Sequence, residues 1–355
     1  MFRHPDFDDH EQVVFAREVA SGLRAIVAVH STVLGPAFGG CRMWPYQDEA
    51  EALTDVLRLS HGMTCKAAIC ELPYGGGKSV ILGDPRQSKT PALLRAMGEV
   101  VDRLGGRYIV ADDIGITLED LRVMREVTAH TAAATLAATQ PLPVTAYGVF
   151  QAIRAAVQHA FDRQDLDGLR VAVQGLGAVG MPLCRYLADA GAALIATDLD
   201  HGRRAQAADA FGARAVEPDA IYGQAADVFA PCALGAILND RTIPLLAARV
   251  VCGGANNQLA EARHAAALAA RGILFVPDYI ANAGGVIDFH QERTGNDTPA
   301  AVLCAVARIH DITSDVLERA ARGGETPLRV ADRVVQERLA AARQRGAAPA
   351  RPHSD

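Results

Sequence analysis

The sequence predicts an α/β protein built from two domains. Its 355 residues are more than one hydrophobic core usually organises. From Ala146 onward, short apolar strands alternate with helical segments, which is typical of a parallel sheet covered by helices on both faces. Residues 131–143 are rich in alanine and threonine, contain two prolines and have no clear period. We therefore place the domain boundary there, between residues 138 and 139.

The first domain, residues 1–138, is predicted to mix strands and helices. Apolar runs predict strands at residues 11–16, 23–30, 79–82 and 107–110. The first two are joined as a hairpin through Ser21 and Gly22. Helical spacing predicts helices at residues 48–59 and 90–104. Thr117 and Asp120 have the spacing of a capping box, which predicts that a further helix begins there.

The second domain, residues 139–326, is predicted to contain a parallel sheet. Its strands are expected at residues 169–174, 193–197, 227–230, 249–252 and 273–276. Two helices are expected at residues 299–322 and 327–343. Residues 344–355 are expected to form a disordered tail.

A glycine-rich turn follows the first strand of this sheet and opens a helix. The motif is Gly175-Leu176-Gly177-Ala178-Val179-Gly180. Gly175 allows a tight turn, Gly177 lets the backbone approach a pyrophosphate, and Gly180 lets the helix pack closely on the strand. The alternative is a turn that packs closely and binds nothing. Because strand, helix and a downstream acidic residue are all in place, the motif predicts a Rossmann dinucleotide-binding domain.

Side chains at the ends of the later strands extend the expected cofactor site. Asp198 ends the second strand, where a carboxylate holds the ribose hydroxyls and would repel a 2′-phosphate. NAD is therefore preferred to NADP, although Arg203 and Arg204 weaken that preference slightly. Three asparagines after later strands are either ligand-binding residues or ordinary turn formers: Asn256, Asn257 and Asn282.

Lysine is scarce in this chain. Of 35 Lys and Arg residues only three are lysines, Lys66, Lys78 and Lys89, which leaves 32 arginines. Arginine cannot be deprotonated in a protein, whereas burial or a neighbouring cation lowers the pKa of a lysine. Lys66 follows a predicted helix, and the glycine triplet before Lys78 gives that lysine an open approach. If both converge on one pocket, one lysine would anchor a carboxylate and the other would act as an acid–base group, with Asp113 as the balancing carboxylate.

These residues also have plainer explanations. Lys66 could snorkel at the surface, Lys78 could begin a strand at a solvent edge, and Asp113 could lie in a simple turn. Lys89, just before a helix, is expected to be an ordinary surface lysine. Apolar surroundings and the scarcity of lysine favour a functional role for the other two.

Charge and cysteine content argue against several classes of function. The formal net charge of -6 and the absence of a basic run argue against binding to nucleic acid or to a membrane surface. Seven cysteines without a C-x-x-C pair fit reduced thiols in a cytoplasm better than disulfides, and the histidines show no metal-ligand spacing, so no metal is expected. The polar start, Met1 to His10, does not resemble a signal peptide, and no apolar run reaches membrane-spanning length.

Several motifs together resemble one enzyme family. They lie at residues 35–45, 62–66, 75–78, 143–148, 230–233, 277–279 and 282–286. In this order they resemble the amino-acid dehydrogenases of the glutamate/leucine/phenylalanine/valine family, and the leucine dehydrogenase branch most. The resemblance implies reversible, NAD-dependent oxidative deamination of an L-amino acid to a 2-oxo acid and ammonia by a homo-oligomer. It also implies that the first domain binds the substrate and carries the oligomerisation surface, and that the helix at residues 327–343 returns to it.

The resemblance further implies roles for single residues. Lys66 would bind the substrate carboxylate. Lys78 would be the general base that activates water, with Asp113 exchanging protons beside it. Thr145 would hold the nicotinamide carboxamide. Three asparagines would complete the cofactor site and position the substrate: Asn256, Asn257 and Asn282.

The expected substrate side chain is constrained by a missing lysine. Glutamate dehydrogenases carry a lysine directly before a Gly-Gly pair, and this chain has Phe38 before Gly39 and Gly40. Because a carboxylate buried against an apolar ring would be unpaired, glutamate is disfavoured and a leucine-like substrate is expected. The expected pocket residues are Phe38, Gly39, Gly40, Met63, Ala111, Asn257, Val286 and Phe289.

The resemblance leaves the substrate open in one respect. Phe38 and Phe289 are larger than the aliphatic residues usual in branched-chain enzymes, so they either narrow the pocket or stack with an aromatic substrate. Phenylalanine or tryptophan dehydrogenase is therefore one alternative. A non-catalytic, NAD-binding amino-acid sensor on the same fold is another, against which Lys78 and Asp113 argue.

Overall fold

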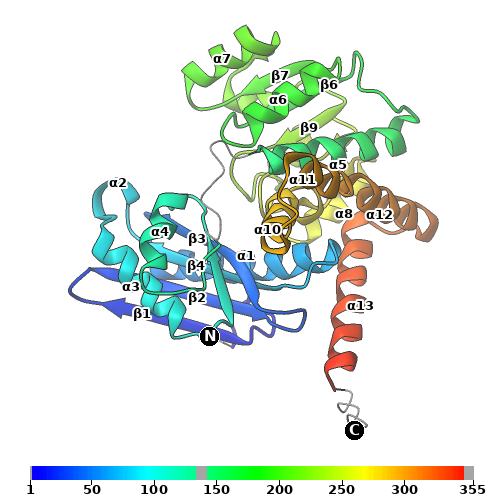
Figure 1. Ribbon diagram of the computed structural model, residues 1–355. Coiled ribbons are helices and arrows are strands. Elements are labelled where there is room, and N and C mark those ends of the chain that lie inside the picture. The colour runs from blue at the N-terminus through cyan, green and yellow to red at the C-terminus, as the bar shows by residue number, and fades with distance from the viewer. Residues whose placement is uncertain (1, 133–141, 348–355) are drawn as a thin grey trace. The chain divides into compact units, whose positions relative to one another are not determined.

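The computed structural model describes residues 2–132 and 142–347 (Figure 1). The chain divides into two compact units. Unit 1 is Met1–Leu136 with Arg333–Asp355, and unit 2 is Ala137–Asp332. The expected boundary between residues 138 and 139 falls within residues 133–141, which lie outside the described residues.

A five-stranded mixed sheet forms the centre of unit 1, in the order β1-β2-β4-β3-β5. Its strands are β1 (Gln12–Glu18), β2 (Leu23–Ser31), β3 (Ala37–Trp44), β4 (Gly75–Leu82) and β5 (Tyr108–Ala111). The pairs β1–β2 and β2–β4 are antiparallel, whereas β3 is parallel to both of its neighbours, β4 and β5. The sequence did not predict β3, because its central Gly39 and Gly40 weaken the strand pattern.

Helices cover both faces of this sheet (Figure 1). Helix α1 (Glu49–Ile69) packs on the face that carries Ala28 and Val80. Helices α3 (Pro91–Asp102) and α4 (Leu118–Arg125) pack on the face that carries Val27 and Tyr108. The predicted capping box is confirmed at the start of α4. A short helix, α2 (Pro85–Ser88), was not predicted from the sequence.

Helix α1 is longer than predicted, and this changes the place of Lys66. The helix begins after Asp48, whose side chain accepts a hydrogen bond from the backbone N–H of Glu51. It continues past Leu59 through a polar stretch that contains Gly62, where the apolar periodicity is interrupted. Lys66 therefore lies in the last turn of α1 and not after it.

Unit 2 contains a six-stranded sheet in the order β11-β10-β9-β6-β7-β8. Its strands are β6 (Arg170–Gln174), β7 (Ala193–Thr197), β8 (Arg214–Ala215), β9 (Val228–Pro231), β10 (Val250–Val251) and β11 (Leu274–Phe275). Every pair of neighbours in this sheet is parallel, which confirms the predicted parallel sheet. The order reverses between β6 and β9, as in doubly wound dinucleotide-binding folds, where ligands bind at that point.

The helices of unit 2 alternate with these strands. They are α5 (Val144–Phe161), α6 (Gly180–Asp189), α7 (His201–Phe211), α8 (Arg263–Ala270), α9 (Asp278–Ala281), α10 (Gly284–Thr294), α11 (Pro299–Ala307) and α12 (Ile309–Gly323), with 3-10 turns at Pro218–Ile221 and Ile243–Leu245. The helix predicted at residues 299–322 is thus two helices, α11 and α12, that meet at Arg308.

The last helix, α13 (Pro327–Ala347), extends beyond its predicted end at Arg343. Residues 344–347 are therefore helical and do not belong to a disordered tail, while residues 348–355 lie outside the described residues. Within unit 1, Arg338 donates to the carbonyls of Ala68 and Ile69 at 2.7 and 2.6 Å and pairs with Glu71 at 2.9 Å. These contacts join α13 to the end of α1.

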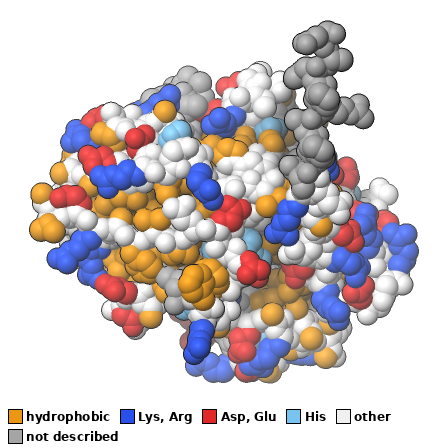
Figure 2. Space-filling model, turned by 90° about the horizontal axis from the view of Figure 1, so that it is seen from below, with side chains coloured by type: hydrophobic (Ala, Val, Ile, Leu, Met, Phe, Trp, Pro, Cys, Tyr) orange, Lys and Arg blue, Asp and Glu red, His pale blue; other side chains and the backbone are white. Residues whose placement is uncertain are grey.

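The surface and the thiols can be described briefly. None of the described helices is long and apolar enough to cross a membrane. Acidic and basic side chains are interspersed on the face shown in Figure 2. All seven cysteines are free, and only Cys304 is exposed.

Candidate active site

Lys78 and Asp113 form an ion pair across the sheet of unit 1. Lys78 lies in β4, is 5% exposed, and alternates with Ser79 so that it shares the α1 face with Val80. Asp113 follows β5, and β3 lies between β4 and β5. The pair therefore reaches over β3 at Gly40. A Cβ atom at Gly40 would lie 2.8 Å from Asp113 Cβ and 3.1 Å from Lys78 Nζ, so the pair needs a glycine there.

Arg42 is a second cation at Asp113, and the sequence did not assign it a role. Its Nη2 lies 3.5 Å from Asp113 Oδ2, while its Nη1 donates to Asp55 Oδ2 of α1 at 2.8 Å. Tyr46 also donates to Asp55 Oδ2, at 2.6 Å. Arg42 thus links the sheet to α1. Together with Lys78 it supplies the positive charge beside Asp113. Its only sequence signal was its place in the motif at residues 35–45.

The two cations determine the charge state of Asp113. Burial by itself would raise the pKa of this carboxyl group. The charges of Lys78 and Arg42, together with hydrogen bonds from Lys78 and from the backbone N–H of Ile114, outweigh burial and lower the pKa of Asp113 to about 2. Asp113 is therefore a carboxylate at neutral pH and can accept a proton from Lys78.

The pocket residues predicted in unit 1 gather beside this pair. Phe38 is 6% exposed, and its ring centroid lies 5.9 Å from that of Tyr74. Gly40 lies opposite Ala111 in the register of β3 and β5. A Cβ atom at Gly39 would meet Met63 Cγ of α1 at 3.3 Å. An apolar wall therefore adjoins the charged pair.

The other two lysines have distinct places. Lys66 is partly exposed and lies three residues after Met63, on the helix that packs against β4. Lys89 Nζ donates to Asp120 Oδ2 at 2.6 Å and to Gly115 O at 3.0 Å. Lys89 is therefore more than the ordinary surface lysine that we expected, since it ties down the loop that begins at Asp113.

The glycine triplet before Lys78 lets the backbone come close to neighbouring segments, as predicted, but Lys78 itself is only 5% exposed and has no open approach. A Cβ atom at Gly75 would lie 1.8 Å from Ser31 O, and one at Gly76 would lie 2.1 Å from Thr64 Oγ1. One at Gly77 would lie 2.6 Å from the ring of Tyr108. These glycines are strand residues that let neighbouring segments approach closely.

Tyr108 supports the site from the other face of the sheet. It is fully buried, and its hydroxyl donates to Gly39 O at 2.7 Å and lies 3.0 Å from Ser79 Oγ. Burial raises the pKa of Tyr108 well above its ordinary value, so the hydroxyl remains a donor. This role of Tyr108 was not predicted from the sequence.

In unit 2, the glycine-rich turn has one open position. Gly175 follows β6 with φ +90°, and a Cβ atom there would lie 2.7 Å from Ala233 Cβ. One at Gly180 would lie 1.8 Å from Gly175 O, at the start of α6. At Gly177, by contrast, a Cβ atom would meet only Arg203 Nη1, at 3.9 Å. The turn therefore leaves room at the residue that a pyrophosphate would approach, and the remaining motif residues, Leu176, Ala178 and Val179, complete it.

Asp198 lies beside this turn. It accepts from the backbone N–H of Leu176 at 2.6 Å and from that of Asp200 at 2.9 Å. Arg203 Nη1 is 3.8 Å from Asp198 Oδ2, so a cation stands next to the carboxylate.

The predicted asparagines lie after β10 and β11. Asn282 Nδ2 donates to Asn256 Oδ1 at 2.8 Å. Among the described residues, Asn282 Oδ1 is buried and finds no hydrogen-bond partner, so it could accept a donor from a bound ligand. The backbone N–H of Asn257 donates to Asp278 Oδ2 at 2.7 Å, and Asn257 has φ 50°. Thr145 begins α5, and its Oγ1 would lie 3.6 Å from a Cβ atom at Gly285. The residues present thus fit a dinucleotide.

Besides Asn257, two more of the predicted pocket residues belong to unit 2. Val286 and Phe289 lie on α10 and are both buried, at 3% and 6% exposure. The Arg293 guanidinium lies 5.7 Å from the ring centroid of Phe289. They therefore lie in a different unit from Phe38.

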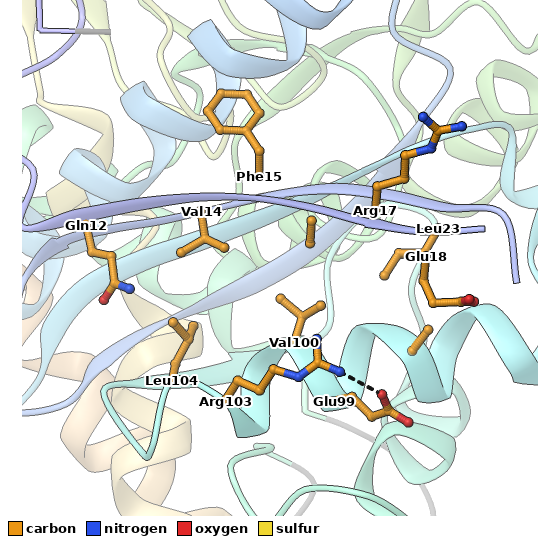
Figure 3. A pocket seen from close by; sticks show the side chains of 12 residues that line it. Gln12, Val14, Phe15, Arg17, Glu18, Leu23, Glu99, Val100, Arg103 and Leu104 are labelled. Carbon is orange, nitrogen blue, oxygen red and sulfur yellow. Dashed lines mark hydrogen bonds and ion pairs between the residues drawn. The ribbon is translucent and has the colours of Figure 1, made fainter. Parts of the chain in front are cut away.

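A groove of about 370 Å³ lies elsewhere in unit 1, between β1 and α3. Val14 and Val100 point into it, and Phe15 points away (Figure 3). Arg103 pairs with Glu99 at its edge, at 3.0 Å. None of the predicted site residues lines this groove.

Comparisons with known proteins identify the family of this chain. Residues 10–130 match the family model described as Glu/Leu/Phe/Val dehydrogenase, dimerisation domain. Residues 141–203 and 201–346 match the model described as Glutamate/Leucine/Phenylalanine/Valine dehydrogenase.

Individual relatives are similar over nearly the whole chain. Leucine dehydrogenase from Bacillus subtilis is 46% identical over 342 residues, which cover 96% of this chain and 94% of that protein. Phenylalanine dehydrogenase from Caldalkalibacillus thermarum is 43% identical and covers 93% of this chain and 91% of its own length. The crystal structure of L-tryptophan dehydrogenase from Nostoc punctiforme has a TM-score of 0.78 and 43% identity, covering 95% of this chain and 97% of the other.

Proposed function

The chain belongs to the glutamate/leucine/phenylalanine/valine dehydrogenase family and is an amino-acid dehydrogenase, and from this premise we propose that it acts on an apolar, leucine-like L-amino acid with NAD. The products are the 2-oxo acid and ammonia, and the reaction is reversible. The observation that carries this proposal is the Lys78–Asp113 ion pair beside the apolar wall at Phe38.

The residues of unit 1 bind the amino acid and move protons. Lys66 holds the α-carboxylate as a flexible point charge. Lys78 takes the proton of the water that adds to the substrate imine, and Asp113 exchanges that proton with it. Transfer of a proton from Lys78 to Asp113 would leave two neutral groups, which burial favours. Arg42 opposes that transfer because it stabilises the carboxylate, so it limits how long the neutral pair persists.

The residues of unit 2 hold the dinucleotide. The Gly175–Gly180 turn and the start of α6 receive the pyrophosphate, Asp198 the ribose, and Thr145 with Asn256, Asn257 and Asn282 the nicotinamide end. A bound nicotinamide would supply the acceptor for the hydride of the substrate Cα. Asp198 favours NAD over NADP, while Arg203 beside it is the feature that would favour NADP.

The side-chain pocket favours apolar substrates. Phe38 and Tyr74 offer rings and no cation where a glutamate side chain would need one. The same ring pair is the specific observation that supports the second candidate, an aromatic amino acid, since it offers a face for stacking. An aromatic amino acid is therefore the alternative to a leucine-like amino acid as the natural substrate.

We also propose a homo-oligomer in the cytoplasm. The family model that matches residues 10–130 describes a dimerisation domain. Seven free thiols fit a reducing compartment.

A substrate panel tests the proposal directly. Full-length protein is mixed with L-leucine, L-isoleucine, L-valine, L-phenylalanine, L-tryptophan or L-glutamate, each with NAD and with NADP, and the absorbance of reduced cofactor is followed. We expect turnover of leucine-like substrates with NAD and none of glutamate. Faster turnover of phenylalanine or tryptophan would support the second candidate. If no apolar amino acid were turned over but NADH bound saturably, the result would instead support the non-catalytic amino-acid sensor.

A lysine exchange tests the acid–base role. Lys78→Arg keeps the charge but not the exchangeable proton, so we expect turnover to fall by at least about 10²-fold while NADH binding is unchanged. Lys89→Arg is the matched control, because an arginine can still pair with Asp120. An active Lys78→Arg enzyme would remove Lys78 from its proposed role.

A further inference from the structure

Three side chains that have no role in the reaction proposed above meet in unit 1, and they come from three separate segments. Asp8 lies in the N-terminal segment, His30 in β2 and His61 in α1. Asp8 Oδ2 is 3.7 Å from His30 Nε2 and 3.4 Å from His61 Nε2, and the three atoms all lie within 4.8 Å of one another. No metal-ligand spacing is visible in the sequence, because residues 8, 30 and 61 are brought together only by the fold.

His30 directs its Nε2 toward Asp8 in this cluster. Its Nδ1 lies 2.7 Å from Thr64 Oγ1, and in the tautomer that carries the proton on Nδ1 the lone pair of Nε2 can bind a metal ion. Thr64 fixes the orientation of the ring, as partners of metal-binding histidines commonly do.

His10 holds Asp8 in place and is not itself a ligand. Its Nε2 donates to Leu57 O at 3.1 Å, and because a carbonyl can only accept, the proton is on Nε2. Its Nδ1 then accepts from the backbone N–H of Asp8, at 3.2 Å. The rings of His10 and His30 also pack edge to face, with centroids 4.8 Å apart. The N-terminal segment is thereby fixed with the Asp8 carboxylate facing both other histidines.

We propose that Asp8, His30 and His61 bind a divalent transition-metal ion of the zinc type. Metal–ligand distances of about 2.0–2.2 Å in tetrahedral geometry require ligand atoms about 3.3–3.6 Å apart. The separations of 3.4 and 3.7 Å need only a small adjustment. Two imidazoles select zinc, cobalt, nickel or copper over magnesium and calcium. The side chains of His61 and Asp8 are 39% and 64% exposed, which gives the ion an entry path and leaves room for water as a further ligand.

A second cluster shows by contrast what makes this one suitable. Asp240, Glu261 and His264 also lie close enough to one another to bind an ion. Arg263, however, donates to both carboxylates, at 2.6–3.0 Å, and occupies their lone pairs. No arginine pairs with Asp8 among the ion pairs of the described residues. The Asp8 cluster is therefore the better site, and the Asp240 cluster is a natural control.

The metal would act on stability and not on the chemistry of the dehydrogenase. It would join the N-terminal segment to β2 and α1, and any ion that binds only the folded chain raises its stability by mass action. This inference is independent of the proposed substrate and cofactor.

Cobalt titration tests it. Metal-stripped, full-length protein is titrated with Co²⁺, whose visible absorption reports its coordination geometry, and Zn²⁺ is then added as a competitor. We expect one equivalent of Co²⁺ to bind and to be displaced by Zn²⁺. Asp8→Asn and His61→Gln should each weaken binding by about tenfold or more. Asp240→Asn and Cys304→Ser should bind as the wild type does.

The melting temperature gives a second reading. Zn²⁺ should raise it in the wild type and in the two controls, but not in Asp8→Asn or His61→Gln. Both of these side chains are partly exposed, so the variants should remain folded, as their melting curves without metal will show. Absence of stoichiometric binding, unchanged binding in Asp8→Asn and His61→Gln, or loss of binding in the controls would each overturn the proposal.

Discussion

Replacing Gly40 with alanine should damage the site while leaving the rest of the chain intact. The added Cβ atom would lie 2.6 Å from Asp112 O and 2.8 Å from Asp113 Cβ, distances that Cβ atoms do not adopt. To move the carbonyl from 2.6 Å to beyond 3.0 Å, the segment after β5 must retreat by at least 0.4 Å. Because the same Cβ lies 3.1 Å from Lys78 Nζ, the lysine is displaced as well.

The size of the effect follows from these contacts. Overpacking of this kind typically costs about 1–3 kcal/mol of unfolding free energy. A displacement of about 1 Å in an active site can cost about 10²-fold in rate, so a shift of a few tenths of an ångström at both partners should lower kcat by about tenfold or more. Initial rates with L-leucine and NAD measure kcat, and urea denaturation measures the unfolding free energy.

Gly62→Ala is the matched control for this experiment. Gly62 lies within α1, and a Cβ atom there would meet nothing within 4 Å. Alanine should therefore stabilise the helix by up to about 1 kcal/mol and leave kcat unchanged. If Gly40→Ala turned over and unfolded as the wild type does, the Lys78–Asp113 pair would not depend on the space above β3, and our account of the site would be refuted.

Three further predictions follow from the charges and the open positions. Because the pKa of Asp113 is lowered from 3.8 to about 2, its ion pairs contribute about 2 kcal/mol of stability above pH 3.8, and this contribution is lost as the pH falls toward 2. In urea denaturation, the difference in unfolding free energy between the wild type and Asp113→Asn should therefore shrink over that range. A difference that widens would contradict this prediction. Arg42→Gln removes a charged donor from Asp55 and a cation from Asp113, which should cost about 1–3 kcal/mol in the same assay and lower the initial rate; wild-type values for both would show that Arg42 is dispensable. Gly177→Ala should fold normally but weaken NADH binding by about 1–3 kcal/mol in a fluorescence titration. Gly223→Ala is the control, because a Cβ atom there also meets open space, and it should bind NADH as the wild type does. Equal binding by both variants would place the pyrophosphate elsewhere.

The dinucleotide-binding half could be predicted from the sequence because its information is local. The Gly175–Gly180 turn joins a strand to a helix that follows it directly, and Asp198 comes directly after the next strand. Each of these features depends on neighbours within a few residues or one βαβ unit. The parallel order of the strands then followed from the alternation of strands and helices.

Unit 1 was harder to predict because its contacts are long-range. β3 was missed since two glycines sit at its centre, and glycine lowers strand propensity unless another backbone approaches closely. Arg42 was missed since its partners, Asp55 and Asp113, come from a helix and a loop far along the chain. The pair of Lys78 and Asp113 was predicted from chemistry alone, but only the structure shows that it reaches over Gly40.

The packing of Gly77 against Tyr108 restricts how this site can change in evolution. A side chain at Gly77 meets the tyrosine ring at 2.6 Å, while loss of the ring leaves a cavity and deprives Gly39 O of its donor. Neither substitution is tolerated alone, so the two positions should vary together among descendants of this chain. The strands that carry Phe38 and Lys78 pack on Gly77 and Tyr108. New substrate preferences should therefore arise first at residues that line the pocket, while Gly77 and Tyr108 stay unchanged.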